Sequence, residues 1–291
     1  MPFFKRRRFV SVVGRKTAVP DGLWMKCSGC QQAVYRPEVE QNLQVCPACD
    51  HHYRISARMR IDITVDPGSF EETHGNIETV DPLEFTVGDV TYPSKIDKAK
   101  QKAGVNEALV TGRATIEEKA AMFGFMDFAF RGGSMASVVG EKFCRVAQDA
   151  IDASLPLIVF SASGGARMEE GILSLMQMAR TSDAVRRMNE AGVPYISVVT
   201  DPTSGGVWAS FASIGDINLA EPNAYIGFAG ARLIQGALKV ELPEGFQRTD
   251  YQFKNGFIDA VVPRSEMRAT LGKLLSYLQP ADLAQLVGVA S

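Results

Sequence analysis

Pro156-Leu-Ile-Val-Phe160 is a short apolar run, and it leads into Ser163-Gly164-Gly165-Ala166-Arg167. The run predicts a buried strand, and the segment after the glycines predicts a helix. The unit then repeats, because Pro194-Tyr-Ile-Ser-Val-Val199 leads into Thr203-Ser204-Gly205-Gly206 and a helix that begins near Val207. Strand, glycine pair and helix in succession indicate a mostly parallel sheet, since parallel strands need crossover connections.

The segments on either side of this repeat continue the same α/β pattern. Two apolar segments upstream predict strands joined by a turn at Glu117–Lys119, and an amphipathic helix follows them. Two short strands and a closing helix are expected downstream. These elements are the strands Ala108–Ile116 and Ala120–Phe130, the helix Ser137–Ala153, the strands Ile217–Ala220 and Ala224–Phe228, and the helix Glu266–Leu278. The large domain is therefore predicted to be α/β and to span residues 107–291.

The glycine pairs stand at the same place in the two successive units, so they are expected to converge on one site. A glycine pair lets the backbone approach a ligand and direct its N–H groups outward, and a helix N-terminus adds a positive dipole. Such donors stabilise charge that develops on a substrate oxygen. The alternative interpretation is that the glycines only permit sharp turns.

Other catalytic patterns are missing from the sequence of the large domain. The three histidines, His51, His52 and His74, all lie before it, which excludes a histidine-based triad built within the α/β core. The glycines have neither the spacing of a dinucleotide site nor the Lys-Ser/Thr of a phosphate loop. We therefore expect oxyanion stabilisation without a histidine base.

Four of the five cysteines form two Cys-x-x-Cys pairs, Cys27 with Cys30 and Cys46 with Cys49, separated by fifteen residues. Two such turns brought face to face supply the tetrahedral thiolate site that Zn²⁺ prefers. Because four thiolates leave no open coordination position, one structural zinc per chain is predicted; a redox dithiol pair is the alternative. Cys144 lies in an apolar helical segment and is expected to be an inert buried thiol.

The composition is 46% hydrophobic and 22% charged with a net charge of −2, which is typical of a soluble globular enzyme or subunit. Basic residues crowd an N-terminal arm, residues 1–22. A zinc ribbon (23–56) and a polar connecting segment with one or two short helices (57–106) come next, including a lysine-rich helical piece near Lys95–Lys102. No stretch of about 20 apolar residues occurs, so no membrane association is expected. Phe9–Val13 is too short for a signal-peptide core, so we expect a cytoplasmic protein, in which cysteines serve metal binding or catalysis rather than disulfides.

Four motifs carry a family resemblance: Phe160-Ser-Ala-Ser-Gly-Gly-Ala-Arg-Met-Glu169, Thr200-Asp-Pro-Thr-Ser-Gly-Gly-Val207, Phe130-Arg-Gly-Gly-Ser-Met135 and Gly245-Phe-Gln-Arg248. From about Asp21 to Leu278, the chain closely resembles the β subunits of bacterial and plastid acetyl-CoA carboxylase carboxyltransferase. Biotin-dependent carboxyltransferases at large share the glycine motifs, and the ribbon marks this subunit. The resemblance implies a crotonase-like fold, the β-β-α superhelix of the ClpP/crotonase class.

The resemblance also implies an activity and partners. Members pair with an α subunit, commonly as α2β2, and work with biotin carboxylase and a biotin carboxyl carrier protein in an ATP-dependent complex. They transfer the carboxyl group of carboxybiotin to acetyl-CoA and make malonyl-CoA for fatty-acid biosynthesis. The biotin-side oxyanion hole would lie largely on the α subunit. This chain has no Met-Lys-Met biotinylation site and no ATP-grasp pattern, so we expect it to be neither the carrier nor the carboxylase.

The same resemblance implies roles for particular residues. The glycine pairs would give N–H groups to the thioester oxygen as it becomes an enolate, and the loop at Gly132, Gly133 and Ser134 would lie near the CoA-binding cleft. Arg131 stands where many members have an apolar residue, and it either touches the CoA phosphates or faces solvent. Three further candidates for phosphate contact, with surface charge as the alternative, are Arg232, Lys239 and Arg248. The ribbon is hypothesised to roof the CoA cleft.

Two other functions stay open at this point. A self-sufficient crotonase-type hydratase or isomerase would need acidic residues near the glycines; Glu169 and Glu170 could serve, or they are helix-start carboxylates. Nucleic-acid binding by the ribbon and the arm is expected to be secondary, since the total charge is near neutral. The arginines that permit it are Arg36, Arg54, Arg58 and Arg60. Arg167 either braces the glycine loop or approaches the substrate.

Overall fold

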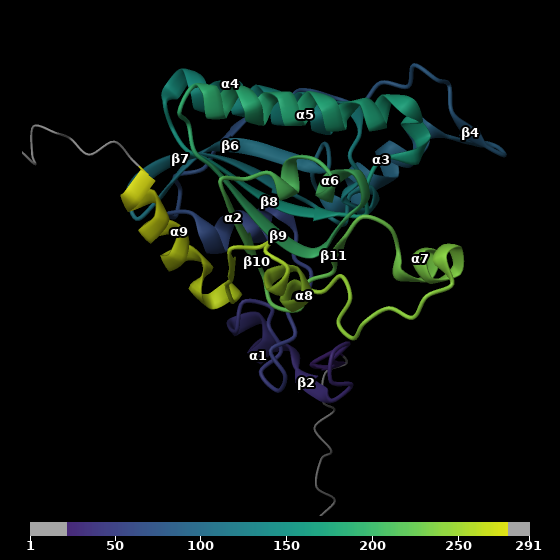
Figure 1. Ribbon diagram of the computed structural model, residues 1–291, viewed down its shortest axis with the longest axis vertical. Coiled ribbons are helices and arrows are strands. Elements are labelled where there is room, and N and C mark those ends of the chain that lie inside the picture. The colour runs from purple at the N-terminus through teal and green to yellow at the C-terminus, as the bar shows by residue number, and fades with distance from the viewer. Residues whose placement is uncertain (1–21, 279–291) are drawn as a thin grey trace, which may run out of the picture.

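A computed structural model describes residues 22–278, and a mostly parallel sheet lies at its centre (Figure 1). The strand order is β12-β10-β9-β8-β7-β6-β3, and β11 pairs with β9 off this path. The pairings from β12 to β7 are parallel, whereas β6 is antiparallel to both β7 and β3. The strands are β3 (Glu71–Thr73), β6 (Leu109–Ile116), β7 (Lys119–Met126), β8 (Leu157–Ser163), β9 (Tyr195–Ser204), β10 (Ile217–Ala220), β11 (Ile226–Gly227) and β12 (Ala260–Val261).

Helices cover both faces of this sheet (Figure 1). On one face, α4 (Ser137–Ala153) and α5 (Ile172–Glu190) lie side by side, and on the other are α2 (Ala57–Thr64) and α9 (Arg264–Leu278). The apolar positions of α4 recur at helical spacing, so that Val139, Phe143 and Val146 are fully buried against the sheet. The predicted α/β class and the helix predicted at Ser137–Ala153 are confirmed.

The hairpin of β6 and β7 is shorter than predicted. Its turn is at Glu117 and Glu118, which both have positive φ, as a two-residue hairpin turn requires. The second strand ends at Met126, so the prediction that it continues to Phe130 was wrong. The chain turns there because the Asp127 carboxylate accepts hydrogen bonds from the N–H groups of Ala129 and Ala57.

The two strand–glycine–helix units differ on the C-terminal side of their glycines. After β8 a short 3-10 turn, η2 (Met168–Glu170), leads into the long helix α5. After β9, α6 (Gly205–Trp208) has four residues, so the helix predicted near Val207 is a single turn, followed by the 3-10 turn η3 (Phe211–Ser213). Ser210 stops α6 from continuing, since its backbone leaves the helical region and its hydroxyl donates to the Gly206 carbonyl at 2.6 Å. Likewise, the strand predicted at Ala224–Phe228 contains only the two residues of β11.

Residues 57–106, expected to connect the ribbon to the large domain, contribute to the core itself. β3 extends the main sheet, and α2 packs against β6 and β7. A hairpin of β4 (Thr86–Val87) and β5 (Val90–Thr91) precedes α3 (Tyr92–Ala103), which contains the predicted lysine-rich piece. The Thr91 hydroxyl accepts from the Ser94 N–H and begins α3, and Gly104, at φ 67°, ends it.

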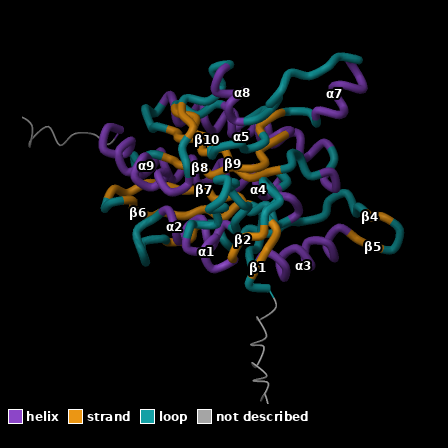
Figure 2. The backbone as a smooth tube through the Cα atoms, turned by 90° about the horizontal axis from the view of Figure 1, so that it is seen from below, coloured by secondary structure: helices purple, strands orange, loops and turns teal. Residues whose placement is uncertain are grey.

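The ribbon and α7 (Ala231–Leu238) lie at the periphery. The ribbon contains β1 (Trp24–Lys26), β2 (Ala33–Tyr35) and α1 (Arg36–Gln41), and it lies below the sheet in Figure 1. A short helix, α8 (Thr249–Lys254), precedes β12. From both viewpoints, α7 and the β4–β5 hairpin project on the same side of the molecule (Figure 2). Among the described residues, no helix has the length and apolar character to cross a membrane. Apart from Gly22, the basic arm expected at 1–22 lies outside the described residues.

Candidate functional site

The two glycine pairs meet at the ends of β8 and β9. A Cβ atom added to Gly205 would lie 2.9 Å from the Gly165 Cα, and one added to Gly165 would lie 3.3 Å from the Gly205 Cα. Both residues also have positive φ, 116° for Gly165 and 59° for Gly205. The approach therefore requires glycine on both loops. We call Gly164, Gly165, Gly205 and Gly206 the glycine crossing.

The amide groups of the glycine crossing are not equivalent. Gly164 N–H donates to the Gly132 carbonyl at 2.8 Å, and Gly205 N–H to the Phe228 carbonyl at 3.1 Å. Gly165 N–H donates to the Ser163 hydroxyl at 3.0 Å. Within residues 22–278, Gly206 N–H has no acceptor, and it lies beside the contact between the loops. The dipole of a four-residue helix adds little, so the donor itself matters more than the helix behind it.

Arg167 braces the first glycine loop. Its side chain is fully buried and donates to both carboxylate oxygens of Glu107, at 2.5 and 3.0 Å. It also donates to the Ser134 carbonyl and hydroxyl, at 2.9 and 3.0 Å. Burial alone would lower the pKa of Arg167, but Glu107 more than offsets this and raises it. Of the two roles left open by the sequence, the structure favours bracing over contact with substrate.

Both candidate glutamates already have partners. Glu170 accepts from the Tyr92 hydroxyl at 2.7 Å and from the Ser137 N–H and hydroxyl at 2.6 Å. It therefore caps the first turn of α4, which is a helix-start role on a neighbouring helix. Glu169 pairs with Arg131 and, at 3.4 Å, with Lys95. Neither carboxylate is free to act as a general acid or base at the glycine crossing.

The loop of Gly132, Gly133 and Ser134 packs directly against the glycine crossing. A Cβ on Gly133 would lie 1.9 Å from the Ala162 carbonyl oxygen, so only glycine fits there. The carbonyl of Gly132 holds the Gly164 N–H, and the Met135 N–H donates to the Gly165 carbonyl at 2.8 Å. This loop therefore sets the position of the first glycine pair.

The four ribbon cysteines come together as predicted. Their Sγ atoms all lie within 4.8 Å of one another, and those of Cys27 and Cys49 are 3.8 Å apart. A tetrahedron with Zn–S bonds of about 2.3 Å has edges of about 3.8 Å, which the Cys27–Cys49 separation matches. Residues Cys27, Cys30, Cys46 and Cys49 would hold a structural zinc. The predicted zinc ribbon is confirmed.

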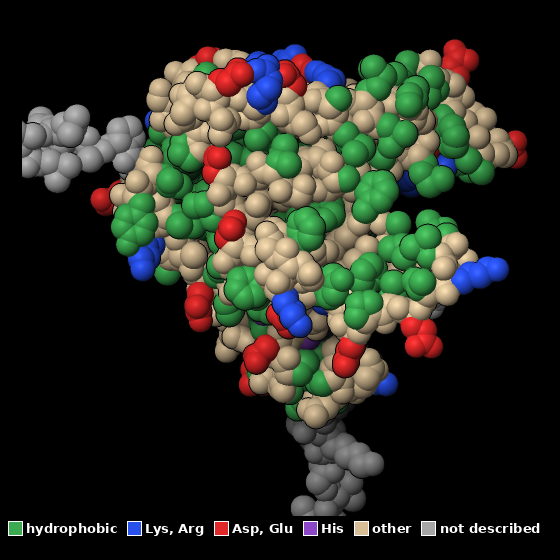
Figure 3. Space-filling view, in the orientation of Figure 1, with side chains coloured by type: hydrophobic (Ala, Val, Ile, Leu, Met, Phe, Trp, Pro, Cys, Tyr) green, Lys and Arg blue, Asp and Glu red, His purple; other side chains and the backbone are tan. Residues whose placement is uncertain are grey.

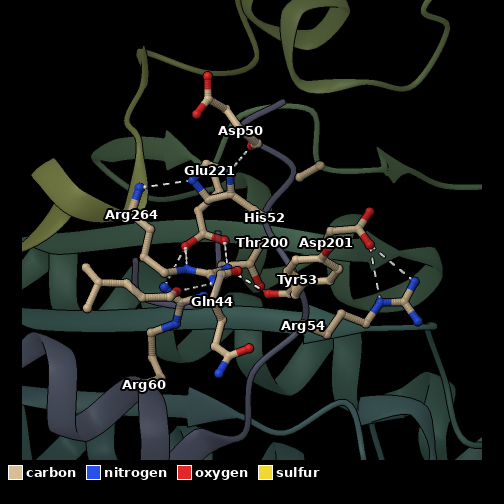
Figure 4. A network of polar contacts seen from close by, with 12 residues as sticks. Gln44, Asp50, His52, Tyr53, Arg54, Arg60, Thr200, Asp201, Glu221 and Arg264 are labelled. Carbon is tan, nitrogen blue, oxygen red and sulfur yellow. Dashed lines mark hydrogen bonds and ion pairs between the residues drawn. The ribbon is translucent and has the colours of Figure 1, made fainter. Parts of the chain in front are cut away.

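Buried charges join the ribbon to the large domain (Figure 4). Glu221, after β10, accepts from Arg60 of α2 at 2.6 Å and from Arg264 of α9 at 2.8 Å. Arg264 also donates to three carbonyls on the ribbon side, those of Leu43, Gln44 and Tyr53. Burial alone would raise the pKa of Glu221, but Arg60 and Arg264 hold it well below the usual range of a carboxyl. We call Arg60, Glu221 and Arg264 the ribbon seat.

His52 is not one of the four zinc ligands, and it adds a further contact between the ribbon and the large domain. Its Nε2 accepts the backbone N–H of Arg264 at 3.1 Å, so Nδ1 carries the proton and donates to the Asp50 carbonyl at 2.8 Å. Burial lowers the pKa of His52, which favours this neutral form. The histidine shortly after the last cysteine pair thus has a structural role.

Most of the remaining basic candidates are ion-paired. Arg54 and Arg248 both lie beside Asp201, Arg58 pairs with Glu72, and Arg60 is buried in the ribbon seat. Three of the four arginines near the ribbon are thus ion-paired and less available to nucleic acid; Arg36 donates to the Gly22 carbonyl. Lys239 ends α7, away from the glycine crossing, and the side chain of Arg232 lies outside the described part of the structure.

Sequence reasoning missed Glu107, Tyr92 and the ribbon seat. These residues act through contacts between segments 43 to 161 positions apart, which no local pattern reveals. The one signal in the sequence was that Glu107 and Glu221 border apolar runs, since buried charges are rare unless paired. Cys144 is half-buried, its thiol donates to the Arg180 carbonyl at 3.5 Å, and burial raises its pKa, as expected of an inert thiol.

Comparisons with known proteins match two parts of the chain. Residues 24–49 match the acetyl-CoA carboxylase zinc finger domain, and residues 52–284 match the carboxyl transferase domain. The chain is 47% identical over 280 residues to the acetyl-coenzyme A carboxylase carboxyl transferase subunit beta of Citrifermentans bemidjiense, covering 96% of this chain and 99% of that protein. The subunit beta of Pelobacter propionicus is 48% identical over 264 residues, or 91% and 93% of the two chains.

Solved structures share the fold at lower identity. The transcarboxylase 12S core superimposes with a TM-score of 0.65 at 24% identity, over 77% of this chain and 42% of that one. A Pseudomonas malonate decarboxylase hetero-tetramer gives a TM-score of 0.63 at 19% identity, over 81% and 90%. The predicted crotonase-like fold is confirmed.

Proposed function

Because the chain belongs to the family of acetyl-CoA carboxylase carboxyl transferase β subunits, we propose that it transfers the carboxyl group of carboxybiotin to acetyl-CoA and so makes malonyl-CoA for fatty-acid biosynthesis. The observation that supports this most directly is the approach of two glycine loops at Gly165 and Gly205, with the Gly206 N–H free beside it among the residues that the structure describes. This arrangement offers a backbone donor to a thioester oxygen.

In the proposed reaction, the glycine crossing stabilises the enolate of acetyl-CoA. Gly206 N–H donates to the thioester oxygen, on which negative charge develops as the α proton leaves. Gly165 N–H becomes the second donor when it exchanges the Ser163 hydroxyl for the substrate. Removal of one such donor raises the barrier by about 2.7–4 kcal/mol in measured cases. Gly132 and Arg167 hold the loops in position before substrate binds, and only the contact between Gly165 and Ser163 must be exchanged.

Among the described residues, neither candidate glutamate nor any histidine is placed to take the α proton, so we expect its acceptor to come from outside this chain. Glu169 and Glu170 are occupied by partners, and the described histidines lie in the ribbon or before β6. Carboxybiotin, when bound, would supply both the carboxyl group and, at its ureido nitrogen, the base that takes the α proton. A self-sufficient hydratase is disfavoured, because its two candidate carboxylates are not free.

Relatives named as subunits and multisubunit neighbours imply that the chain works in a complex. We propose an α subunit as partner, in an α2β2 assembly, with biotin carboxyl carrier protein and biotin carboxylase completing the cycle in the cytoplasm. Apolar side chains beside the glycine crossing support a protein partner there: Met168 is 86% exposed and Ile172 is 66% exposed. Figure 3 shows apolar side chains gathered on both sides of the notch next to α7.

Malonyl-CoA-dependent carboxylation of free biotin tests this proposal. The chain with a cognate α subunit should carry out the reaction, and the chain alone should not. Robust turnover by the chain alone would overturn the division of the site between two subunits. The same preparation should be given an enoyl-CoA, since efficient hydration without the α subunit would favour a hydratase instead.

A further inference from the structure

The second glycine loop is held in place by β11, a strand of two residues. Thr203 N–H donates to the Tyr225 carbonyl at 2.8 Å, and Gly205 N–H donates to the Phe228 carbonyl at 3.1 Å. These two bonds flank the parallel pairing of β11 with β9. Because the Phe228 carbonyl accepts from Gly205, Gly206 N–H is the free donor of this loop among the residues that the structure describes. The position of β11 therefore decides which amide can meet a substrate.

The Gly245-Phe-Gln-Arg248 motif supports β11 along its other edge. Ile226 N–H donates to the Gln247 carbonyl at 2.8 Å, and the Gln252 side chain donates to the Ile226 carbonyl at 2.7 Å. The Gln247 side chain is itself buried, at 5% exposed, and its Oε1 accepts from the Tyr225 hydroxyl at 2.7 Å. Gln247 thus holds β11 through its side chain as well as its backbone.

Gly227 leaves the room that this side chain occupies. A Cβ atom added to Gly227 would lie 2.3 Å from the Gln247 Cδ, which is closer than two carbon atoms can approach. The φ of Gly227 is outside the left-handed region, so space and not backbone conformation requires glycine here. Gly227 pairs with Ser204, the residue before the second glycine pair. The Gln247 side chain therefore lies over β11 next to the glycine crossing.

The backbone of Gln247 has a conformation that favours glycine. Its φ is 60°, in the left-handed region that few residues other than Gly, Asn and Asp adopt. Strained positions of this kind cluster at functional sites and persist only where the surrounding contacts determine them. A glycine would be less strained at this position, so the contacts of the glutamine side chain must offset the cost.

We propose that Gln247 is a positioning residue of the glycine crossing, whose side chain fixes β11 and so holds the Phe228 carbonyl on the Gly205 N–H. This inference rests on the proposed carboxyltransferase function. Gln247 does for the second glycine loop what Arg167 does for the first, and it acts through the backbone of β11. The Gly245-Phe-Gln-Arg248 motif thereby gains a role in the site.

Gln247→Gly tests this role in the assembled carboxyltransferase. The variant should lower kcat and kcat/KM for acetyl-CoA by the same factor, about 10–100, because a displaced donor weakens binding of the transition state and not of the substrate. Ser154→Gly is the matched control and should change neither constant, since Ser154 also has a positive φ, 52°, at an exposed position after α4. A fall in kcat no larger than in the control would overturn the proposal.

Gln247→Met serves as a second variant that keeps the length of the side chain over β11. It offers no oxygen to the Tyr225 hydroxyl, so kcat should fall by up to about tenfold with KM unchanged. Unchanged kcat in this variant would contradict the role assigned to the hydrogen bond with Tyr225.

Gly227→Ala tests the contact from the other side. The added methyl should push the Gln247 side chain away and lower kcat. In the Gln247→Gly background the same methyl has room, so the double variant should be as active as Gln247→Gly alone. Losses that multiply in the double variant would show that the two residues act separately, against the proposal.

Hydrogen exchange of the assembly, followed by mass spectrometry, locates the effect without turnover. Gln247→Gly should speed exchange in residues 203–206 and 225–228 and leave residues 163–167 as in the wild type. Faster exchange throughout the sheet would indicate general destabilisation and overturn the proposal. If the wild-type assembly transfers no carboxyl group but this exchange pattern is found, the proposed function fails while the positioning role stands. If it transfers the group and Gln247→Gly changes neither kcat nor exchange, the reverse holds.

Discussion

The ribbon seat and the glycine crossing are both held by a buried arginine–glutamate pair, but only the ribbon also has a four-thiolate metal site. In each, a buried arginine pairs with a buried glutamate and donates to backbone carbonyls of a loop: Arg264 with Glu221, and Arg167 with Glu107. The loop held at the seat belongs to a ribbon with its own four-thiolate site. The glycine loops are held by Arg167, the Ser163 hydroxyl and neighbouring backbone groups.

The buried pair therefore has a different role in each region: it attaches the ribbon to the large domain, whereas it helps to set the conformation of the glycine loops. A zinc held by the four thiolates would fix the fold of the ribbon, so the ribbon seat would need only to position a folded unit. At the glycine crossing the buried pair helps to define the shape itself, because glycines have no side chains to pack. Loss of a seat residue should leave a folded but loosened ribbon. Loss of Arg167 or Glu107 should disturb catalysis and stability together.

Zinc removal should give the largest difference in stability between the ribbon and the α/β core. Metal binding contributes about 10–16 kcal/mol in small zinc-finger peptides, so chelation should unfold the ribbon while the α/β core keeps its helices. In a Trp208→Phe background, Trp24 of β1 is the remaining tryptophan and reports on the ribbon by fluorescence. Elemental analysis should give one zinc per chain before chelation. A Trp24 signal insensitive to chelation would contradict the assigned role of the metal.

Glu107→Gln should have the next largest effect. It leaves the Arg167 guanidinium buried without its counter-ion, which costs about 3–5 kcal/mol of unfolding free energy. Urea denaturation measures this cost, and kcat should fall in parallel. Glu141→Gln is the matched control, because Glu141 pairs with partly exposed arginines and its loss should cost less than about 1 kcal/mol. Equal losses in the two variants would show that the Arg167 pair is not special.

Gly205→Ala should act on catalysis more than on folding. The added methyl would lie 2.9 Å from the Gly165 Cα, at a backbone φ of 59°, so the loops must separate. We expect kcat to fall by about 10²–10³, equivalent to losing one oxyanion donor. Gly236→Ala on α7, where a Cβ meets nothing within 4 Å, is the control for an inserted methyl. An active Gly205→Ala enzyme with unchanged kcat would remove the glycine crossing from the mechanism.

The smallest effect is a difference in acid sensitivity at the ribbon seat. Arg60 and Arg264 depress the pKa of Glu221 in the folded protein, whereas in the unfolded chain it is about 4.3. Its contribution to stability is therefore complete above that value and is lost as pH falls further. Wild type should lose up to about 1.4 kcal/mol per pH unit more than Glu221→Gln below pH 4. Parallel curves from urea denaturation at pH 3–5 would show that Glu221 is not held ionised.

The sequence predicted those features that depend on residues close together along the chain. The ribbon could be predicted because metal ligation needs cysteines at short spacing. The helix α4 could be predicted because burial imposes a helical period on its apolar residues. The end of β7 at Met126 could not, because it depends on Asp127 accepting from Ala57, 70 positions away. The contact between Gly165 and Gly205 was anticipated from two equivalent strand ends. The sequence did not predict which amide stays free, because the carbonyls of Gly132 and Phe228 accept from Gly164 and Gly205.

The seat of the ribbon also sets an order of events during synthesis. His52 and the backbone of Arg264 that it holds are 212 residues apart along the chain. At translation rates of about 5–20 residues per second, the ribbon leaves the ribosome roughly 10–40 s before α9 does. Four nearby thiols and one ion suffice to fold it in that interval. We expect each newly made chain to load its metal first and to dock the loaded ribbon only when its last helix arrives.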